Sequence, residues 1–591
     1  MSQKVILSAN EAVAWAACKA GCTVASAYPG TPSTEILENV AKFKETINCE
    51  WAVNEKVAME VAIGASIAGA RALTAMKHVG LNVAMDPLMT YTYVGANGGL
   101  VIVSADDPGM HSSQNEQDSR NLVKFARAAL FEPADSQETY DMVIAAFEVS
   151  EQFQVPAFIR LSTRTSHTST VVDVGDDFGP GKAEPKPYVK DIRRYIPVPM
   201  FARPQRLQAQ KRTEALRAFA CETAFNRIEA GDRRLGIITS GVTYQYVKEV
   251  FPEFSVLKLG FTNPLPSELV RTFAAGVDRV LVIEELDPFM EDQVRALGIK
   301  VVEHETELNM LEMNPLRLMA LRKELLGDVE LPSVRRADEG LPTRPPVLCA
   351  GCSHRGVFYT LAKLGATVTG DIGCYTLGAF PPLSAMDTTI CMGACIGNAF
   401  GMEKAGFKGR LCAVIGDSTF FHSGLTGILN VLYNGGRITT VVLDNRITGM
   451  TGHQENPGSG KTLCGEPAPV TDIAEVAKAM GFKRVVRVDA YDLAALERVL
   501  KEELDAPEPS VVIAGGPCRI AAKLMNAGTY EVDPAKCKAC GACFKLGCPA
   551  IERGEATPDG KRFKSHIDPV QCSGCDLCRQ TCKFGAISKV R

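Results

Sequence analysis

The chain has 591 residues, of which 46% are hydrophobic and 22% are charged, and its formal net charge at pH 7 is −4. This length predicts about four domains, and the composition is that of a globular protein. The slight excess of acidic residues argues against nucleic-acid binding and against attachment to an anionic membrane surface, because both need clustered positive charge.

The apolar segments are too short to cross a membrane. The best candidate, residues 57–76, is interrupted by Glu60 and Arg71, whereas a spanning helix needs about 20 predominantly apolar residues in a row. Glu11 interrupts the apolar core that a secretion signal would need. We therefore expect a cytoplasmic protein whose 20 cysteines are metal ligands or free thiols before they are disulfides.

Residues 1–172 predict one α/β domain. Ser8 and Glu11 have the spacing of a capping box at the start of a helix, and residues 24–27 predict a short strand. The next segment, Tyr-Pro-Gly-Thr-Pro-Ser-Thr at 28–34, predicts a tight loop because prolines and a glycine restrict it. Taken alone, a turn is the simplest interpretation of this segment, which has Thr31 at its centre.

Glu55 opens a predicted helix that is rich in small residues. A carboxylate is favoured at this position by the helix dipole, so a structural cap is a sufficient explanation of Glu55 from the residues alone. Glu60 is the other carboxylate of the same helix.

The polar run 111–120 follows a predicted strand at 100–104. A solvated loop is the default interpretation of such a run. Its last residue, Arg120, is also a candidate anchor for a substrate carboxylate, because a guanidinium can bind a carboxylate through two parallel hydrogen bonds.

The middle of the chain predicts two linkers around a second α/β domain. Residues 173–233 begin with a stretch rich in proline, glycine and charge, which predicts a linker or wrapping arm. Residues 234–329 alternate strand and helix patterns. Residues 330–346 again carry proline and charge and predict a second linker.

A strand–helix–strand unit in the region 411–443 carries polar residues at both strand ends. The first strand runs into Gly416, Asp417 and Ser418, and the second is followed by Asn445. In open α/β sheets ligands bind at the carboxyl ends of the strands. Carboxylate, amide and carbonyl oxygens suit a hard cation such as Mg²⁺ that also holds a diphosphate. A plain turn is the alternative, since Gly-Asp alone says little.

Four cysteines accompany this unit. Cys349 and Cys352 form a close pair, and Cys374 and Cys518 lie at the ends of other segments. From the residues alone, zinc, disulfide chemistry and an iron–sulfur cluster all remain open for such a pair.

The tail, residues 526–591, has two cysteine triplets with two-residue gaps, each followed by a fourth cysteine. A tight triplet lets one loop ligate three irons of a 4Fe–4S cluster while the fourth ligand comes from the other repeat, whereas zinc ribbons use pairs. The pattern departs from the bacterial ferredoxin form in the four-residue gap before Cys548 and in Lys583. The predicted ligand sets are Cys537, Cys540, Cys543 and Cys582 for one cluster, and Cys572, Cys575, Cys578 and Cys548 for the other.

Several of these motifs together resemble the thiamine diphosphate-dependent 2-oxoacid:ferredoxin oxidoreductases. The segments 416–418 and 444–445 resemble the Gly-Asp-Gly and Asn-Asn diphosphate motif, with Ser418 and Asp444 as departures. The segment 450–454 resembles the family's Met-Thr-Gly-Gly-Gln, and 28–34 its Tyr-Pro-x-Thr-Pro-Ser-x. The resemblance implies that thiamine diphosphate and Mg²⁺ are bound by Gly416, Asp417, Ser418, Asn445, Ile447 and Thr451, of which Asp417, Asn445 and the Ile447 carbonyl ligate the metal.

The same resemblance implies roles for the other candidates. Glu55, with Gly64 nine positions later, has the spacing of the glutamate that activates the aminopyrimidine ring, and Glu60 does not. Thr31 would lie beside substrate and cofactor. Cys349, Cys352, Cys374 and Cys518 resemble the family's ligands for a proximal 4Fe–4S cluster, although Ala350 and Ser353 differ from the usual motif.

The implied fold is multidomain α/β. It comprises two doubly wound thiamine diphosphate-binding-type domains, pyrimidine-type (1–172) and diphosphate-type (347–525), a transketolase-C-like domain (234–329) and a ferredoxin-like module with two 4Fe–4S clusters (526–591). This order resembles the large subunit of the family branch that acts on aryl 2-oxoacids such as indolepyruvate and phenylpyruvate. The implied reaction is oxidative decarboxylation with coenzyme A to an aryl-acetyl-CoA, carbon dioxide and reduced ferredoxin.

Two other functions remain open at this point. A non-oxidative thiamine decarboxylase would leave the cluster motifs without a role, and an electron-transfer subunit would have a vestigial thiamine fold. The resemblance also implies partners. No segment is left for the gamma-type domain of pyruvate-type relatives, so we expect a separate small (beta) subunit and an α2β2 assembly, with a self-sufficient homodimer as the alternative.

Overall fold

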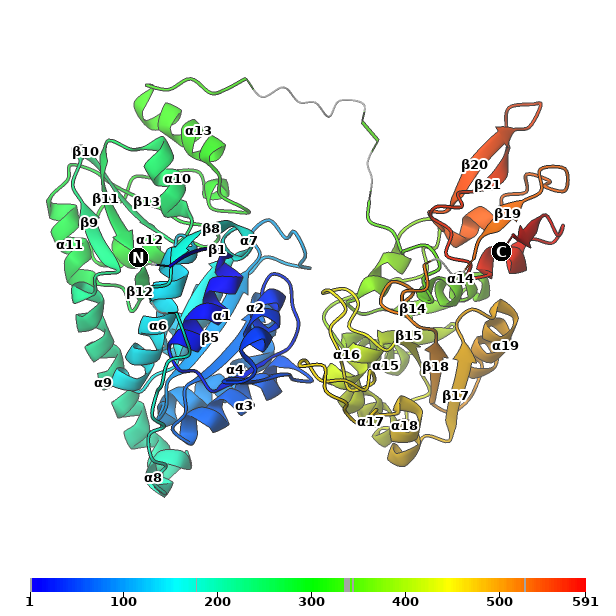
Figure 1. Cartoon of the computed structure of the whole chain (residues 1–591), viewed down its shortest axis with the longest axis horizontal. Coiled ribbons are helices and arrows are strands. Elements are labelled where there is room, and N and C mark those ends of the chain that lie inside the picture. The colour runs from blue at the N-terminus through cyan, green and yellow to red at the C-terminus, as the bar shows by residue number, and fades with distance from the viewer. Residues whose placement is uncertain (1–2, 177, 334–340, 343–344, 526–527, 591) are drawn as a thin grey trace. The chain divides into compact units, whose positions relative to one another are not determined.

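The computed structural model describes residues 3–176, 178–333, 341–342, 345–525 and 528–590 (Figure 1). The chain divides into two compact units, residues 1–337 and 338–591. Of the expected linker 330–346, residues 334–340 and 343–344 lie outside the described residues.

The first unit begins with an α/β domain built on a seven-stranded sheet in the order β12-β6-β7-β5-β4-β2-β3. All neighbours are parallel except the antiparallel edge pair β12–β6. β5 and β7 are buried along their whole length, as expected for parallel strands covered on both faces by helices. The strands are β2 (Val24–Ala27), β3 (Asn48–Trp51), β4 (Ala72–Lys77), β5 (Leu100–Asp106), β6 (Ala129–Phe131), β7 (Ala157–Ser162) and β12 (Phe261–Asn263).

Helices cover both faces of this sheet, and Ser8 and Glu11 form the predicted capping box at the start of the first of them. A short antiparallel pair, β1 (Lys4–Ser8) with β8 (Ser169–Asp173), closes the domain. The helices are α1 (Ala9–Lys19), α2 (Thr34–Val40), η1 (Ala41–Phe43), α3 (Glu55–Ile67), α4 (His78–Val94), α5 (Ser119–Ala126), α6 (Ser136–Phe153) and α7 (Thr163–His167).

The segment expected as a linker, 173–233, contains more regular structure than its composition indicated. After α8 (Ile192–Tyr195) comes α9 (Pro199–Glu222), a helix of 24 residues that contacts α4 and α11. β9 (Asn226–Glu229) already belongs to the next sheet. Proline at the first helical position starts α9, because proline lacks only an N–H that would be unpaired there.

The second domain of this unit has a four-stranded sheet in the order β13-β10-β11-β9. β12 leaves this domain and pairs with β6, so it completes the sheet of the first domain. The new strands are β10 (Asp232–Ser240), β11 (Phe254–Leu259) and β13 (Val280–Ile283), and the helices are α10 (Thr243–Val250), α11 (Ser267–Ala275), α12 (Phe289–Ala296), η2 (Thr306–Leu308) and α13 (Pro315–Leu326).

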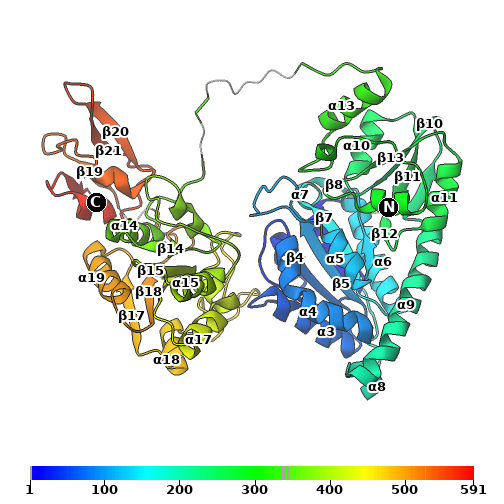
Figure 2. The same ribbon diagram turned by 180° about the vertical axis from the view of Figure 1, so that it is seen from behind.

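The second unit begins with a fully parallel five-stranded sheet in the order β14-β15-β16-β18-β17 (Figure 2). The two strands of the unit predicted in the region 411–443 are β15 and β16. The strands are β14 (Thr367–Thr369), β15 (Leu411–Gly416), β16 (Thr439–Asp444), β17 (Arg484–Asp489) and β18 (Ser510–Gly515). The helices are α14 (His354–Leu364), η3 (Cys374–Ala379), α15 (Ala394–Lys404), α16 (Asp417–Thr419), η4 (Phe420–Gly424), α17 (Leu425–Tyr433), α18 (Ile473–Met480) and α19 (Leu493–Leu504).

The tail folds into a small module that packs against α14 (Figure 2). It contains the antiparallel pairs β19 (Tyr530–Val532) with β22 (Ile587–Lys589) and β20 (Ile551–Ala556) with β21 (Phe563–Ile567). Two short helices, η5 (Cys543–Leu546) and α20 (Leu577–Thr581), carry cysteines. Cys543 and Cys578 belong to the hydrophobic core of this module, so apolar side chains other than cysteine form only part of its small interior.

Among the described residues, no helix combines the length and apolar character required to cross a membrane.

Candidate active site and cysteine clusters

Asp417 and Asn445 follow neighbouring parallel strands whose register pairs Gly416 with Leu443. Both residues therefore lie at the carboxyl edge of the sheet. Asp417 is only 3% exposed, and burial raises the pKa of its carboxyl group to about 7, with a further contribution from Asp444. A buried carboxylate without a countercharge is costly, so this site favours a bound cation.

The loop after β16 folds over this edge. The Asn445 side-chain oxygen accepts from the Ile447 N–H at 3.1 Å, and Thr448 Oγ1 donates to Ser418 Oγ at 2.9 Å. Thr451 Oγ1 donates to Gln454 Oε1 at 2.5 Å. These bonds connect the expected diphosphate residues into one loop structure around Asp417.

The sequence alone did not identify three residues at this edge. Asn456 Nδ2 donates to Asp417 Oδ2 at 3.3 Å. His354 is buried, which lowers its pKa to about 4, and its Nε2 lies 3.3 Å from Asn445 Nδ2. Tyr375 explains why position 416 is a glycine, because a Cβ there would lie 2.6 Å from the Tyr375 ring. Only His354 had a signal, its place two residues after Cys352.

The four proximal cysteines lie at the same edge. The pKa of Cys374 is raised to about 11, mainly by burial and in smaller part by the neighbouring thiols Cys349 and Cys518. Burial likewise raises the pKa of Cys352 to about 12, with added contributions from Cys374 and Cys349. A Cβ on Gly449 would lie 3.6 Å from Cys374 Sγ and 3.8 Å from Asn445 Nδ2, so this thiol and this amide flank one glycine.

The eight tail cysteines line two separate cavities, grouped as the spacing predicted. The cavity that contains Cys572 is also lined by Gly351 and Arg355 of the preceding domain. The cavity that contains Cys537 is lined only by residues of the tail module, among them Lys538 and Phe584. We call them the near cavity (Cys548, Cys572, Cys575, Cys578) and the far cavity (Cys537, Cys540, Cys543, Cys582).

Within the described part of the chain, no group of three or more His, Cys, Asp or Glu side chains has an arrangement that could hold a single metal ion. Each of the two tail cysteine sets instead lines a cavity, which is the arrangement that a cluster of several irons needs, because its ligands bind different irons.

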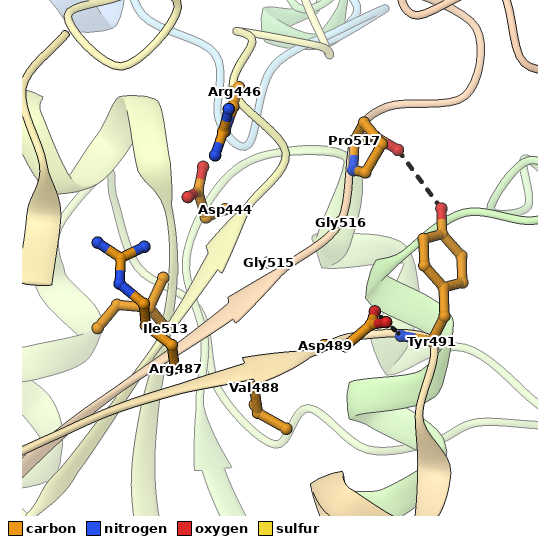
Figure 3. A pocket seen from close by; sticks show the side chains of 10 residues that line it. All are labelled: Asp444, Arg446, Arg487, Val488, Asp489, Tyr491, Ile513, Gly515, Gly516 and Pro517. Atoms are coloured by element: carbon orange, nitrogen blue, oxygen red, sulfur yellow. Dashed lines mark hydrogen bonds between the residues drawn. The ribbon is translucent and has the colours of Figure 1, made fainter.

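A further pocket lies at the carboxyl ends of β16, β17 and β18 (Figure 3). Its walls carry both signs of charge, with Asp444 beside Arg446, and Arg487 and Asp489 farther along. Tyr491 donates from its hydroxyl to the Pro517 carbonyl at 3.4 Å at one side of the pocket. This polar pocket adjoins the strand end that carries Asn445.

In the first unit, Glu55 is the first residue of α3 and is 5% exposed. Position 80 in α4 must be a glycine, since a Cβ there would lie 2.6 Å from Glu55 Oε1. Glu60 lies on the exposed side of α3 and pairs with Lys56. The burial of Glu55 and the exposure of Glu60 agree with the choice of Glu55 as the functional candidate.

Thr31 lies in a loop at the carboxyl edge of the first sheet. Its carbonyl accepts from Ser112 Oγ at 3.4 Å, and the Ser112 carbonyl accepts from Lys77 Nζ at 3.0 Å. Burial lowers the pKa of Lys77, while the charges of Asp107 and Glu55 oppose that shift. Lys77 is thus a cation close to both candidate residues, and the sequence analysis did not select it.

Arg120 has a structural role. It is 0% exposed, its Nη2 donates to Asp118 at 2.6 Å, and its Nη1 donates to Glu284 at 2.7 Å. It also donates to the carbonyls of Glu285 and Asp287, which ties α5 to the second domain. The expectation that Arg120 anchors a substrate carboxylate is therefore not supported, because its guanidinium is buried and already paired.

Comparison with known proteins places the chain in a family. Residues 15–213 match the pyruvate flavodoxin/ferredoxin oxidoreductase thiamine-diphosphate-binding domain, and residues 371–514 match the C-terminal TPP-binding domain of thiamine pyrophosphate enzymes. The indolepyruvate oxidoreductase subunit IorA of Pyrococcus abyssi is 41% identical over 100% of this chain and 97% of its own length. The chain belongs to the family of indolepyruvate oxidoreductase subunits IorA.

Other relatives agree with this assignment. IorA of Methanothermobacter thermautotrophicus is 40% identical over 99% of this chain and 97% of its own length. The ketoisovalerate oxidoreductase subunit VorA of Pyrococcus abyssi is 32% identical over only 34% of this chain and 53% of its own length. The expected resemblance is confirmed, and the chain is an oxidoreductase subunit with a multidomain α/β fold that depends on thiamine diphosphate.

Proposed function

We propose that this chain is the large subunit of an enzyme that oxidatively decarboxylates aryl 2-oxoacids of the indolepyruvate and phenylpyruvate type. Coenzyme A would accept the acyl group and ferredoxin the electrons. The observation that carries this proposal is the grouping of the cysteines. Four lie at the edge that carries Asp417 and Asn445, and eight more line two cavities in the tail. A non-oxidative decarboxylase has no use for this arrangement.

The diphosphate group and Mg²⁺ would be held at the carboxyl edge of the second unit's sheet. Asp417, Asn445 and the Ile447 carbonyl would ligate the metal, and Gly416, Ser418 and Thr451 would contact the cofactor. The buried Asp417 fits this role because no described residue pairs its carboxylate with a positive charge, and a divalent cation would supply that countercharge. When bound, thiamine diphosphate supplies the electron sink for decarboxylation.

Glu55 would hydrogen-bond a ring nitrogen of the cofactor and hold the proton whose transfer activates it. Its burial against Gly80 favours a single fixed position for the carboxyl group. Glu55 and Asp417 belong to different units of the chain, and they would serve the pyrimidine end and the diphosphate end of the cofactor, respectively.

In place of Arg120, Lys77 would anchor the substrate carboxylate, beside Thr31. Among the described residues Lys77 forms no ion pair, and its ammonium donates to a backbone carbonyl, so it can accept a carboxylate partner.

Electrons would pass from the proximal cysteine set to the near cavity, then to the far cavity and out to ferredoxin. Support for this order comes from Gly351, which lies between Cys349 and Cys352 and also lines the near cavity. The far cavity includes Cys540, which is exposed, so an external carrier can approach it.

The relatives are named as subunits, and we propose a small beta subunit and an α2β2 assembly for this chain as well. The test is to express this chain alone and with the small subunit, reconstitute both anaerobically and assay a panel of 2-oxoacids with coenzyme A and ferredoxin. Acyl-CoA formation with ferredoxin reduction, preferring aryl substrates, is expected only with both chains. Aldehyde release without acceptor reduction would identify a non-oxidative decarboxylase, and full turnover by the single chain would overturn the partner proposal.

A further inference from the structure

Arg355, in the first turn of α14, carries a buried charge that has no anionic partner in the described part of the chain. Its side chain is 2% exposed. Its Nη1 donates to the Leu546 carbonyl at 2.6 Å, and its Nη2 donates to the carbonyls of Leu348 and Cys349. Among the described residues no carboxylate pairs with it, and its Nε–H has no hydrogen-bond acceptor. Neutral carbonyls alone do not repay the burial of a full charge.

The position of Arg355 indicates where its counter-charge belongs. The side chain lines the near cavity beside Cys548, Cys572 and Cys575. A Cβ on Gly547, which precedes Cys548, would lie 3.4 Å from Arg355 Nη1. On its other side, Arg355 Nη2 donates to the carbonyl of Cys349, a member of the proximal set. One cation therefore acts on both the proximal set and the near cavity.

Arg519 has a similar arrangement where the proximal cysteine loop meets the tail module, a junction that we call the seam. It follows Cys518, its Nη2 donates to the carbonyls of Leu524 and Ser573, and its Nε–H is also buried without an acceptor. A Cβ on Gly351 would lie 2.8 Å from Arg519 Cδ and 3.2 Å from Cys575 Cβ, so this arginine and this cysteine flank the same glycine. Two guanidinium groups thus lie where the proximal cysteine loop meets the near cavity.

We propose that the Arg355 guanidinium is the counter-charge of the iron–sulfur clusters held by the proximal set and the near cavity, and that it raises their reduction potentials. This inference rests on the proposed function, because it requires clusters at both places. Cysteine ligands bind as thiolates, so each cluster site is anionic and becomes more so by one unit on reduction. A fixed cation in a water-poor seam stabilises the reduced form more than the oxidised form.

The test is an anaerobic redox titration of the reconstituted full-length complex, followed by electron paramagnetic resonance. In Arg355→Gln we expect at least one midpoint potential to become more negative, with at least a tenfold lower ratio of reduced to oxidised cluster at a fixed potential. For one electron this is about 59 mV. Arg355→Lys keeps the positive charge, so its midpoint potentials should lie close to those of the wild type. Arg553→Gln, which removes an exposed arginine of the same module, should leave all midpoints unchanged.

Iron content separates the possible failures. A wild-type complex without clusters would refute the proposed function itself. Full iron content with unmoved midpoints in Arg355→Gln would overturn only the role of Arg355. If Arg355→Gln loses iron, Arg355→Lys decides: retained clusters with near-normal midpoints support the charge, and equal loss of iron in both variants shows that Arg355 serves only to pack the seam.

Discussion

The hydroxyl of Ser573 donates a hydrogen bond to the carbonyl of Ala350 at 3.2 Å, across 223 positions of sequence. Each of these residues directly follows a cysteine, Cys572 in the tail and Cys349 in the preceding domain. The bond therefore joins a proposed ligand loop of the near cavity to a proposed ligand loop of the proximal cluster. This hydrogen bond would give the two proposed clusters a direct connection between their ligand loops.

The first prediction concerns Gly351, in the middle of that seam. Its φ is +70°, and a Cβ there would lie 2.0 Å from Ser573 Oγ and 3.2 Å from Cys575 Cβ. Gly351→Ala should therefore displace the module and slow ferredoxin reduction at least about tenfold. Gly365→Ala is the matched control, because Gly365 has a φ of +63° but open space around its Cβ position. Equal loss of electron transfer in both variants would show that backbone strain, and not the seam, is responsible.

The second prediction separates the two carboxylates of α3. Glu55→Gln should lower kcat by about 10²-fold or more, because proton transfer by a positioned group contributes about 10²–10⁴. Glu60→Gln should retain activity, because Glu60 is exposed and, among the described residues, forms an ion pair only with Lys56. The measurement is acyl-CoA formation at saturating thiamine diphosphate. Full activity in Glu55→Gln would rule out its role.

The third prediction concerns the cation site. Asp417 is the one carboxylate among the proposed Mg²⁺ ligands. Calorimetry on Asp417→Asn should therefore show that Mg²⁺-dependent cofactor binding is lost. Asp444→Asn should bind the cofactor at least as well as wild type, because Asp444 contributes to the raised pKa of Asp417. Wild-type binding by Asp417→Asn would contradict the assignment of the metal ligand.

The fourth prediction is a pH dependence of stability in the first unit. Burial raises the pKa of Glu285 to about 7, from an ordinary value of 4.5. The folded protein therefore holds a proton that the unfolded chain releases, and the resulting stability is present below about pH 4.5 and is lost as the pH rises to about 7. Glu285→Gln keeps an acceptor for the Met313 N–H and should flatten this dependence. The full effect is on the order of 3 kcal/mol.

Denaturant unfolding of the first unit at several pH values measures this effect. Asp278→Asn is a suitable control, because Asp278 precedes β13 and is exposed to solvent. An identical pH profile in wild type and Glu285→Gln would show that Glu285 is not the responsible group.

The sequence predicted those parts of the structure that depend on local chemistry. The ends of β15 and β16 and the capping box of α1 follow from patterns within short segments, and the grouping of the tail cysteines follows from the repetition of one spacing. Such features need no knowledge of distant contacts, because turn residues and strand alternation determine them.

The features that were missed depend on distant contacts. Arg120 lies in a polar run, and its partner Glu284 is 164 residues away, so its burial has no local signal. β12 has only three residues and is defined by pairing with β6 of another domain. The charged composition around α9 indicated a linker, whereas contacts with α4 and α11 supply the buried side of that helix.

The cysteines in the core of the tail module affect how stable the protein is towards oxygen. Cys543 and Cys578 contribute to the interior that holds the module together. If the proposed clusters are bound there, their oxidative loss would leave these thiols around an empty space and remove the cross-links between segments, so damage to the inorganic group would become damage to the fold. We expect brief oxygen exposure to make 528–590 sensitive to protease while the parallel sheet of the same unit survives, which time-resolved proteolysis with mass spectrometry would detect. Oxygen would then determine not only whether the enzyme turns over but how long the polypeptide persists.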